Sequence, residues 1–149
     1  MNNQPITQSV DILLAEDNDD DILLIRESFA DAKIVNVLNV VRDGEEALAY
    51  LRREGEYKDA VMPGLLLLDI NMPKKNGFEV LMEVKADAAL RHLPVVMLTT
   101  SQSEADVVKS YSEGACSYIM KPTRFEELAR VVKQFALYWA LVARIPARS

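Results

Sequence analysis

The sequence predicts an α/β protein built on a doubly wound, five-stranded parallel sheet. Five short apolar runs recur along the 149 residues, and helical periodicity follows each of them. The runs are continuously apolar instead of alternating with polar residues, which is typical of parallel strands covered on both faces. Half of the residues are hydrophobic, so the chain can enclose one sizeable core.

The predicted strands are apolar or β-branched runs that lie between turn signals. They cover residues 10–15, 34–41, 65–68, 95–98 and 117–120. Residues 1–9 are polar and are predicted to form a disordered N-terminal tail. Residues 10–149 are then expected to form one domain without a separate output domain.

Five helices are expected between and after these strands. The acid-rich residues 17–21 favour the start of the first, and Asp43-Gly44 begins the second. The third follows a loop rich in helix breakers at residues 73–77, and Gly114 ends the fourth. The last helix is extended and runs from about residue 123 to 143. Apolar residues at helical spacing in the first three helices are Ile22, Ile25 and Phe29, then Ala47, Leu48 and Leu51, then Phe78, Leu81 and Met82.

Composition excludes several classes of protein. The formal net charge of −6 argues against a nucleic-acid surface, which depends on Lys and Arg. No apolar run approaches the roughly 20 residues of a membrane helix. The single cysteine, Cys116, is expected to be a small buried hydrophobe in a reducing compartment, and His92 an exposed turn residue. We therefore expect a cytoplasmic protein with neither a membrane nor a nucleic-acid partner.

Chemically reactive side chains stand at the ends of the predicted strands. Glu16-Asp17 follow the first strand, Asp69 the third, Thr99 the fourth and Lys121 the fifth. In a doubly wound sheet the carboxyl ends of the strands form the site. We therefore expect these residues to converge on one edge of the sheet.

Three converging carboxylates repel one another, and a hard divalent cation removes that repulsion. Mg²⁺ prefers oxygen ligands, so Glu16, Asp17, Asp69 and the backbone carbonyl of Asn71 are its candidate ligands. The metal and Lys121 would neutralise an incoming phosphoryl group. Asp69 would attack that group as a nucleophile and form an acyl phosphate, with the Thr99 hydroxyl bonded to a phosphoryl oxygen.

These motifs, in this order, resemble the receiver domain of two-component signalling. The matching residues are Glu16-Asp17, Asp69 with residues 70–73, Gly77, Thr99 and Lys121-Pro122. The resemblance implies a flavodoxin-like (β/α)5 receiver fold and a response regulator that takes a phosphoryl group from a histidine kinase onto Asp69. It also implies that Tyr118 swings inward with Thr99 as the switch, and that the output is a phosphorylation-dependent protein contact.

A narrower resemblance concerns the last third of the chain. Residues 99–101 and 116–119, and the late Phe135, Tyr138 and Trp139, are similar to stand-alone regulators that partner phytochrome-type histidine kinases. The implied partner is a sensor kinase of that type.

Two other functions compete with this interpretation. A phosphohydrolase of the Asp-nucleophile type usually has a second Asp two residues after the first, but Asn71 stands there and cannot exchange a proton. At most slow self-phosphorylation and self-dephosphorylation are expected, so we do not expect an enzyme. A DNA-binding transcription factor needs a further module, whereas only 28 residues follow Lys121 and the final helix uses them.

The second half of the final helix is apolar nearly all round, so one face would be left in water. Such patches usually mark an interface, and aromatic residues anchor them. A homodimer is therefore expected through the final helix and the adjoining face of the fourth helix and fifth strand. Its candidate interface residues are Phe135, Tyr138, Trp139, Leu141 and Val142.

Overall fold

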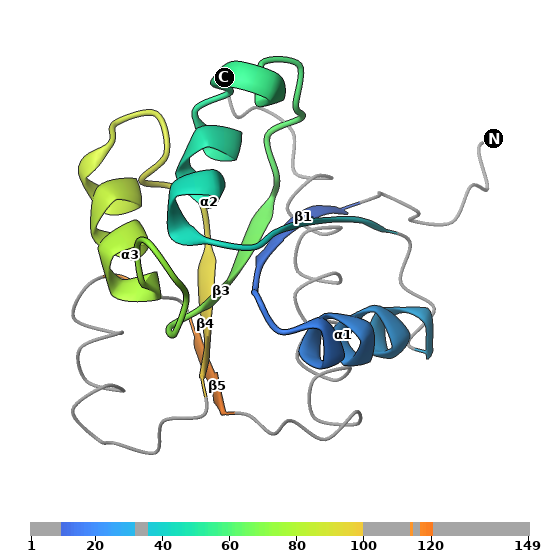
Figure 1. Cartoon of the computed structure of the whole chain (residues 1–149). Coiled ribbons are helices and arrows are strands. Elements are labelled where there is room, and N and C mark those ends of the chain that lie inside the picture. Colours follow the sequence, from blue (N-terminus) through green and yellow to red (C-terminus); the bar gives the residue numbers. More distant parts are fainter. Residues whose placement is uncertain (1–9, 32–35, 100–113, 115–116, 121–149) are drawn as a thin grey trace, which may run out of the picture.

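The computed structural model of the chain describes residues 10–31, 36–99, 114 and 117–120. Five parallel strands form one sheet in the order β2-β1-β3-β4-β5 (Figure 1). Their bounds are Val10–Ala15 for β1, Asn36–Val41 for β2, Leu65–Asp69 for β3, Val95–Thr99 for β4 and Ser117–Met120 for β5. The order places β1 and β3 side by side at the centre, with β4 next to β3.

Helices lie on both faces of this sheet, with α1 on one face and α2 and α3 together on the other (Figure 1). Their bounds are Asp19–Asp31 for α1, Gly44–Leu51 for α2 and Gly77–Ala86 for α3, and a short 3-10 helix, η1, covers Gly55–Tyr57. The predicted α/β class with a parallel sheet is confirmed. The predicted tail, the fourth helix and the final helix lie outside the described residues.

The core consists of two apolar layers, one on each face of the sheet. Successive residues of a strand enter opposite layers, because side chains alternate across a sheet. In β3, Leu66 and Leu68 belong to the layer beneath α2 and α3, whereas Leu65 and Leu67 belong to the layer beneath α1. Both layers consist of buried apolar side chains, and this explains why the strands are continuously apolar.

Side-chain caps fix where the helices begin. The Asn18 side chain accepts a hydrogen bond from the Asp21 amide (3.0 Å) at the start of α1. Asp43 caps α2 by accepting from the Glu46 amide (2.7 Å). Asn76 and Glu79 form a reciprocal capping box at α3. Each cap lies at the carboxyl edge of the sheet, so each helix begins close to the site.

One expected core residue of α3 faces solvent. The sequence groups Met82 with Phe78 and Leu81, but Met82 is 55% exposed. Val80 and Val84 are fully buried in its place. Because almost every turn of α3 carries several apolar residues, periodicity alone could not identify which of them face the sheet. Among the helices that the structure describes, none combines the length and apolarity needed to cross a membrane.

Candidate functional site

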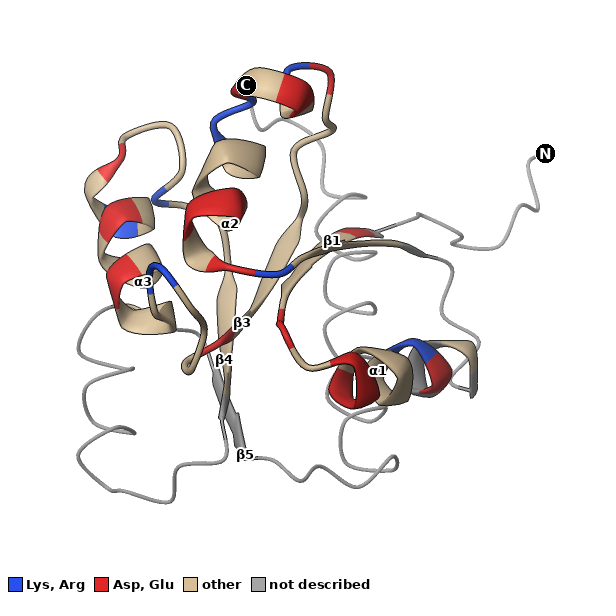
Figure 2. Cartoon of the chain, viewed as in Figure 1, with Lys and Arg blue, Asp and Glu red and all other residues tan. Residues whose placement is uncertain are grey.

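Three carboxylates meet at the carboxyl edge of β1 and β3. The strands are paired so that Ala15 lies opposite Leu68. Glu16, which directly follows β1, and Asp69, the last residue of β3, therefore lie at the same level. One carboxylate oxygen from each of Glu16, Asp17 and Asp69 lies within 4.8 Å of the other two. Figure 2 shows the acidic stretch where β1 passes into α1, next to the end of β3. The structure thus brings together the three carboxylates that the sequence placed at this edge.

The three acids differ in their access to water. Glu16 is fully buried and Asp69 is 3% exposed, whereas Asp17 is exposed. Glu16 accepts a hydrogen bond from the Asn18 amide (3.2 Å), and both buried acids make further interactions within the protein. Buried carboxylates are costly unless hydrogen bonds or positive charge compensate them. An exposed acid beside two buried ones leaves this cluster open to solvent on one side.

The loop after Asp69 is closed upon itself. The Gly77 amide donates to the Ile70 carbonyl oxygen (2.8 Å) and thereby joins the two ends of residues 70–77. A Cβ atom at Gly77 would lie 2.5 Å from the Asp69 carbonyl oxygen, so only glycine fits this approach. Asn71, the predicted carbonyl ligand, lies in this loop two residues after Asp69 and is exposed.

The remaining predicted site residues belong to the outer strands or lie beyond them. Thr99 is the last residue of β4 and pairs with Met120 of β5, and Tyr118 pairs with Met97. The structure describes the backbone of Thr99 and Tyr118 but not their side chains. Lys121 directly follows β5 but lies outside the described residues, as do Phe135, Tyr138, Trp139, Leu141 and Val142.

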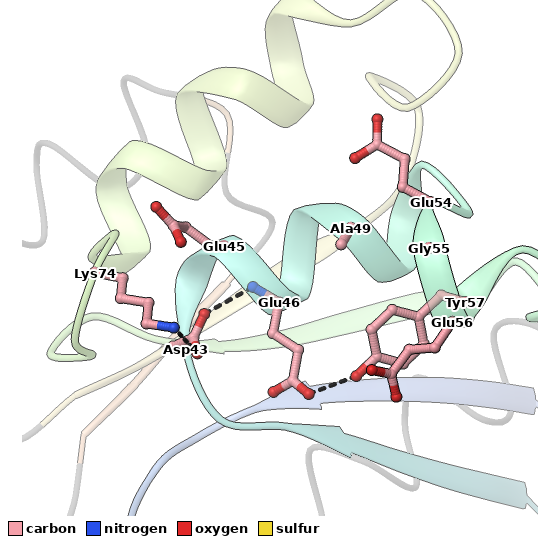
Figure 3. A pocket seen from close by; sticks show the side chains of 9 residues that line it. All are labelled: Asp43, Glu45, Glu46, Ala49, Glu54, Gly55, Glu56, Tyr57 and Lys74. Carbon is pink, nitrogen blue, oxygen red and sulfur yellow. Dashed lines mark hydrogen bonds and ion pairs between the residues drawn. The ribbon is translucent and has the colours of Figure 1, made fainter.

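A second acidic region lies on the outer side of α2, facing η1 (Figure 3). It is an open depression lined by Asp43, Glu45, Glu46, Ala49, Glu54, Gly55, Glu56, Tyr57 and Lys74. The Tyr57 hydroxyl donates to Glu46 Oε2 (2.5 Å). Burial, and then this bond, raises the pKa of the Tyr57 hydroxyl. The carboxylates of the β1–β3 edge are not part of its lining.

The contact between α2 and the loop after Asp69 was missed by the sequence reasoning. The sequence indicates only a turn and a helix cap at Gly44, whereas the structure buries Gly44 against Lys75. The adjacent Asp43 forms an ion pair with Lys74 (3.6 Å between Oδ2 and Nζ). The only available signal was the Asp43-Gly44 dipeptide, which indicates a helix start but not what packs on it.

Comparison with protein families matches residues 12–133 to the response regulator receiver domain. Response regulator Rcp1 of Synechocystis sp. is 40% identical over 136 residues, which are 91% of this chain and 92% of that protein. The methanogenesis regulatory protein FilR2 of Methanothrix harundinacea, described as probable, is 42% identical over 86% of this chain and 82% of its own length.

Solved structures agree with the sequence relatives. The phosphorylated cyanobacterial phytochrome response regulator RcpA has a TM-score of 0.80 and 44% identity, covering 94% of this chain and all of its own. The Mn²⁺-bound form of Rcp1 has a TM-score of 0.78 and 39% identity, and the match covers 93% of this chain and 99% of Rcp1. The family match spans most of the chain, and these relatives are covered over 82% or more of their own length. This chain belongs to the response regulator receiver family.

Proposed function

We propose that this response regulator accepts a phosphoryl group from a histidine kinase on Asp69. The observation that carries the proposal is the position of Asp69, which ends β3 with its carboxylate within 4.8 Å of those of Glu16 and Asp17. The location of Asp69 at the end of β3, directly before the loop closed by the hydrogen bond from Gly77 to Ile70, supports its choice as the acceptor over Glu16 and Asp17.

The chemistry follows from a carboxylate nucleophile. An Asp69 oxygen attacks phosphorus, the bond from phosphorus to the donor's histidine nitrogen breaks, and its electron pair stays on that nitrogen. The product is an acyl phosphate, which water later hydrolyses. Lys121, next to the end of β5, would place an ammonium beside the phosphoryl oxygens. Because Asn71 offers no exchangeable proton for rapid turnover, the protein acts as a slow switch and not as a phosphohydrolase.

The carboxylate cluster fits a divalent cation, and we propose Mg²⁺. All candidate donors are oxygens, namely the carboxylates of Glu16, Asp17 and Asp69 and the backbone carbonyl of Asn71, and the exposure of Asp17 leaves room for water ligands. When bound, Mg²⁺ supplies positive charge that offsets the carboxylates and the incoming phosphoryl oxygens. The relative Rcp1 has been solved in a Mn²⁺-bound form, which supports a divalent ion.

Acetyl phosphate labelling tests the acceptor. The wild-type chain with Mg²⁺ is expected to gain one phosphoryl group by intact-protein mass spectrometry, and EDTA is expected to prevent it. Asp69→Asn should abolish the mass gain, whereas the matched control Asp59→Asn, which changes an exposed aspartate beyond η1, should retain it. Stoichiometric labelling of Asp69→Asn would assign the acceptor elsewhere.

We further propose that Thr99 and Tyr118 report the phosphoryl group to the surface formed by the fourth helix and β5. Thr99 lies one residue beyond the β4 residue that pairs with Asp69, so it stands at the same edge of the sheet. Phosphorylation would then shift a population between two states. Thr99→Ala should leave Asp69 labelling measurable while removing the phosphorylation-dependent change in partner affinity. An unchanged affinity difference would refute this coupling.

The proposed partners are a phytochrome-type sensor kinase and a second copy of the chain. The name of RcpA as a phytochrome response regulator supports the first. The apolar residues of the final helix, Phe135, Tyr138, Trp139, Leu141 and Val142, support the second. We also propose a cytoplasmic flavodoxin-like (β/α)5 domain at residues 10–149 with an extended final helix, preceded by a polar tail at residues 1–9.

A further inference from the structure

The first turn of α2 packs directly on the loop that follows Asp69. Gly44, the first residue of α2, is buried, and a Cβ atom placed there would lie 2.2 Å from the Lys75 carbonyl oxygen. The same Cβ would lie 2.6 Å from the Lys75 Cβ. Because the nearest atom is backbone, no rotamer change could relieve the overlap. Any side chain at this position must therefore displace the loop or the helix.

Charged side chains reinforce this contact on both sides. Lys74 points from the loop toward Asp43 at the start of α2 (Figure 3), with 3.6 Å between Nζ and Oδ2. Asp43 also caps α2 through the Glu46 amide, so one carboxylate serves the helix and the loop. The neighbouring Lys75 forms an ion pair with Glu83 of α3. The loop is thus held between α2 and α3.

The other side of the loop is fixed to the backbone of the acceptor. The Gly77 amide donates a hydrogen bond to the Ile70 carbonyl oxygen. Gly77 also approaches Asp69 so closely that a Cβ atom added to it would lie 2.5 Å from the Asp69 carbonyl oxygen. Between these fixed points, Lys74 adopts a left-handed conformation with φ of 68°, which a lysine rarely adopts without support. A displacement at Gly44 is therefore passed to the turn that begins at Asp69.

We propose that Gly44 is a positioning residue for the Asp69 site, with the ion pair between Asp43 and Lys74 as its polar counterpart. The start of α2 sets the shape of the loop at residues 70–77 and thereby the position of Asn71, the proposed carbonyl ligand. The chemical consequence, weaker Mg²⁺ binding and slower labelling, rests on the proposed function. The structural consequence at Gly77 does not depend on it.

Gly44→Ala tests the proposal, and Gly55→Ala is the matched control. Gly55 lies just beyond α2 with a φ of 59°, so alanine strains its backbone, but its added Cβ meets no atom within 4 Å. In the metal-free full chain, Gly44→Ala should accelerate hydrogen exchange of the Gly77 amide by about tenfold relative to Gly55→Ala. It should also weaken binding of Mg²⁺, measured by calorimetry with the metal alone, by about tenfold. Equal Gly77 exchange in the two variants would overturn the proposal.

A charge reversal covers the case in which Gly44→Ala does not fold. Lys74→Asp places two carboxylates against each other, while aspartate tolerates a left-handed backbone better than lysine does. Faster exchange at Gly77 would then arise from repulsion and not from strain. Lys58→Asp, which makes the same charge change at an exposed residue after η1, should leave Gly77 unaffected. Indistinguishable Gly77 exchange in Lys74→Asp and Lys58→Asp would contradict the proposal.

These outcomes separate the two claims. A wild-type chain that neither binds Mg²⁺ nor becomes labelled would overturn the proposed function, and Gly77 exchange alone would then decide the role of Gly44. A wild-type chain labelled on Asp69, together with a folded Gly44→Ala variant of unchanged Mg²⁺ affinity and Gly77 exchange, would overturn only the positioning role.

Discussion

Glu16 and Asp17 are neighbours in the chain, yet only Glu16 is removed from solvent. Removing the buried Glu16 would disturb the hydrogen bond to the Asn18 amide and the packing around it. Asp17 can be removed with little effect on folding, because its side chain already faces water. It is therefore the residue at which loss of metal binding can be separated from loss of structure.

Asp17→Ala should weaken Mg²⁺ binding by at least about tenfold, which corresponds to about 1.4 kcal/mol. The reason is that one of only three clustered carboxylates is lost. Asp20→Ala is the control, since Asp20 is also an exposed acid, lies in the first turn of α1 and is outside the cluster. Calorimetric titration of both variants checks this expectation. Wild-type affinity in Asp17→Ala would remove Asp17 from the set of ligands.

The site positions of these acids could be predicted from the sequence because they depend only on the neighbouring strand. An acid directly after a buried strand lies at the edge of the sheet whichever way the loops run. Gly44 followed no such rule, since its contact with Lys75 depends on how α2 lies against a loop about thirty residues away. A pattern in the sequence shows that a glycine is present, but not which backbone approaches it.

At the scale of elements, α2 and α3 are joined along one seam by charged residues. The Glu83 carboxylate of α3 accepts a hydrogen bond from Lys75 Nζ. It also accepts one from Arg52 at the end of α2, with 3.2 Å between Arg52 Nη2 and Glu83 Oε1. Arg52 also forms an ion pair with Asp87 at the end of α3, with 3.7 Å between Nε and Oδ2. The hydrogen bond from Lys75, supported by that from Arg52, holds the pKa of the Glu83 carboxyl below its ordinary value of 4.5, although partial burial acts in the opposite direction.

This lowered pKa predicts a pH dependence of stability. The ionised Glu83 is favoured in the folded state, so its contribution is fully present above pH 4.5 and is lost as the pH falls through the lower folded-state pKa. Glu83→Gln should therefore reduce the free energy of unfolding at pH 7 and should flatten its decline as the pH falls below 4.5. Urea unfolding at several pH values measures both effects, with the exposed Glu54→Gln as control. Parallel pH profiles for wild type and Glu83→Gln would refute this role.

The elements themselves were predictable where one type of signal dominated. Continuous apolar runs predicted the strands, since both faces of the sheet are covered, and Asp43 predicted the start of α2 through its cap. The breaker-rich residues 73–77 indicated only that α3 begins after them, and the structure shows Asn76 as its cap. The face of α3 that packs on the sheet was less predictable, because Val80, Leu81 and Met82 are adjacent apolar residues and only the first two are buried. Packing against the sheet, and not periodicity, selects between them.

At the scale of the whole molecule, we propose self-association through the final helix that the sequence predicts at residues 123–143. If this helix forms as the sequence predicts, Phe135, Tyr138, Trp139, Leu141 and Val142 would leave apolar surface that one copy of the domain could not fully cover. Sedimentation velocity at micromolar concentration should show a dimer without phosphorylation, and removal of residues 139–149 should yield a monomer. A monomeric wild type, or a dimer indifferent to this truncation, would contradict the proposed interface.

The most direct test of the whole account is chemical mapping of the phosphorylated residue. Borohydride reduces an acyl phosphate to an alcohol and releases phosphate, which converts an aspartyl side chain to that of homoserine. After treatment with acetyl phosphate and Mg²⁺, followed by borohydride, peptide mass spectrometry should find homoserine at position 69 alone, and none when EDTA is present. Homoserine at position 17, or at any residue other than 69, would contradict the assignment of Asp69 as the acceptor.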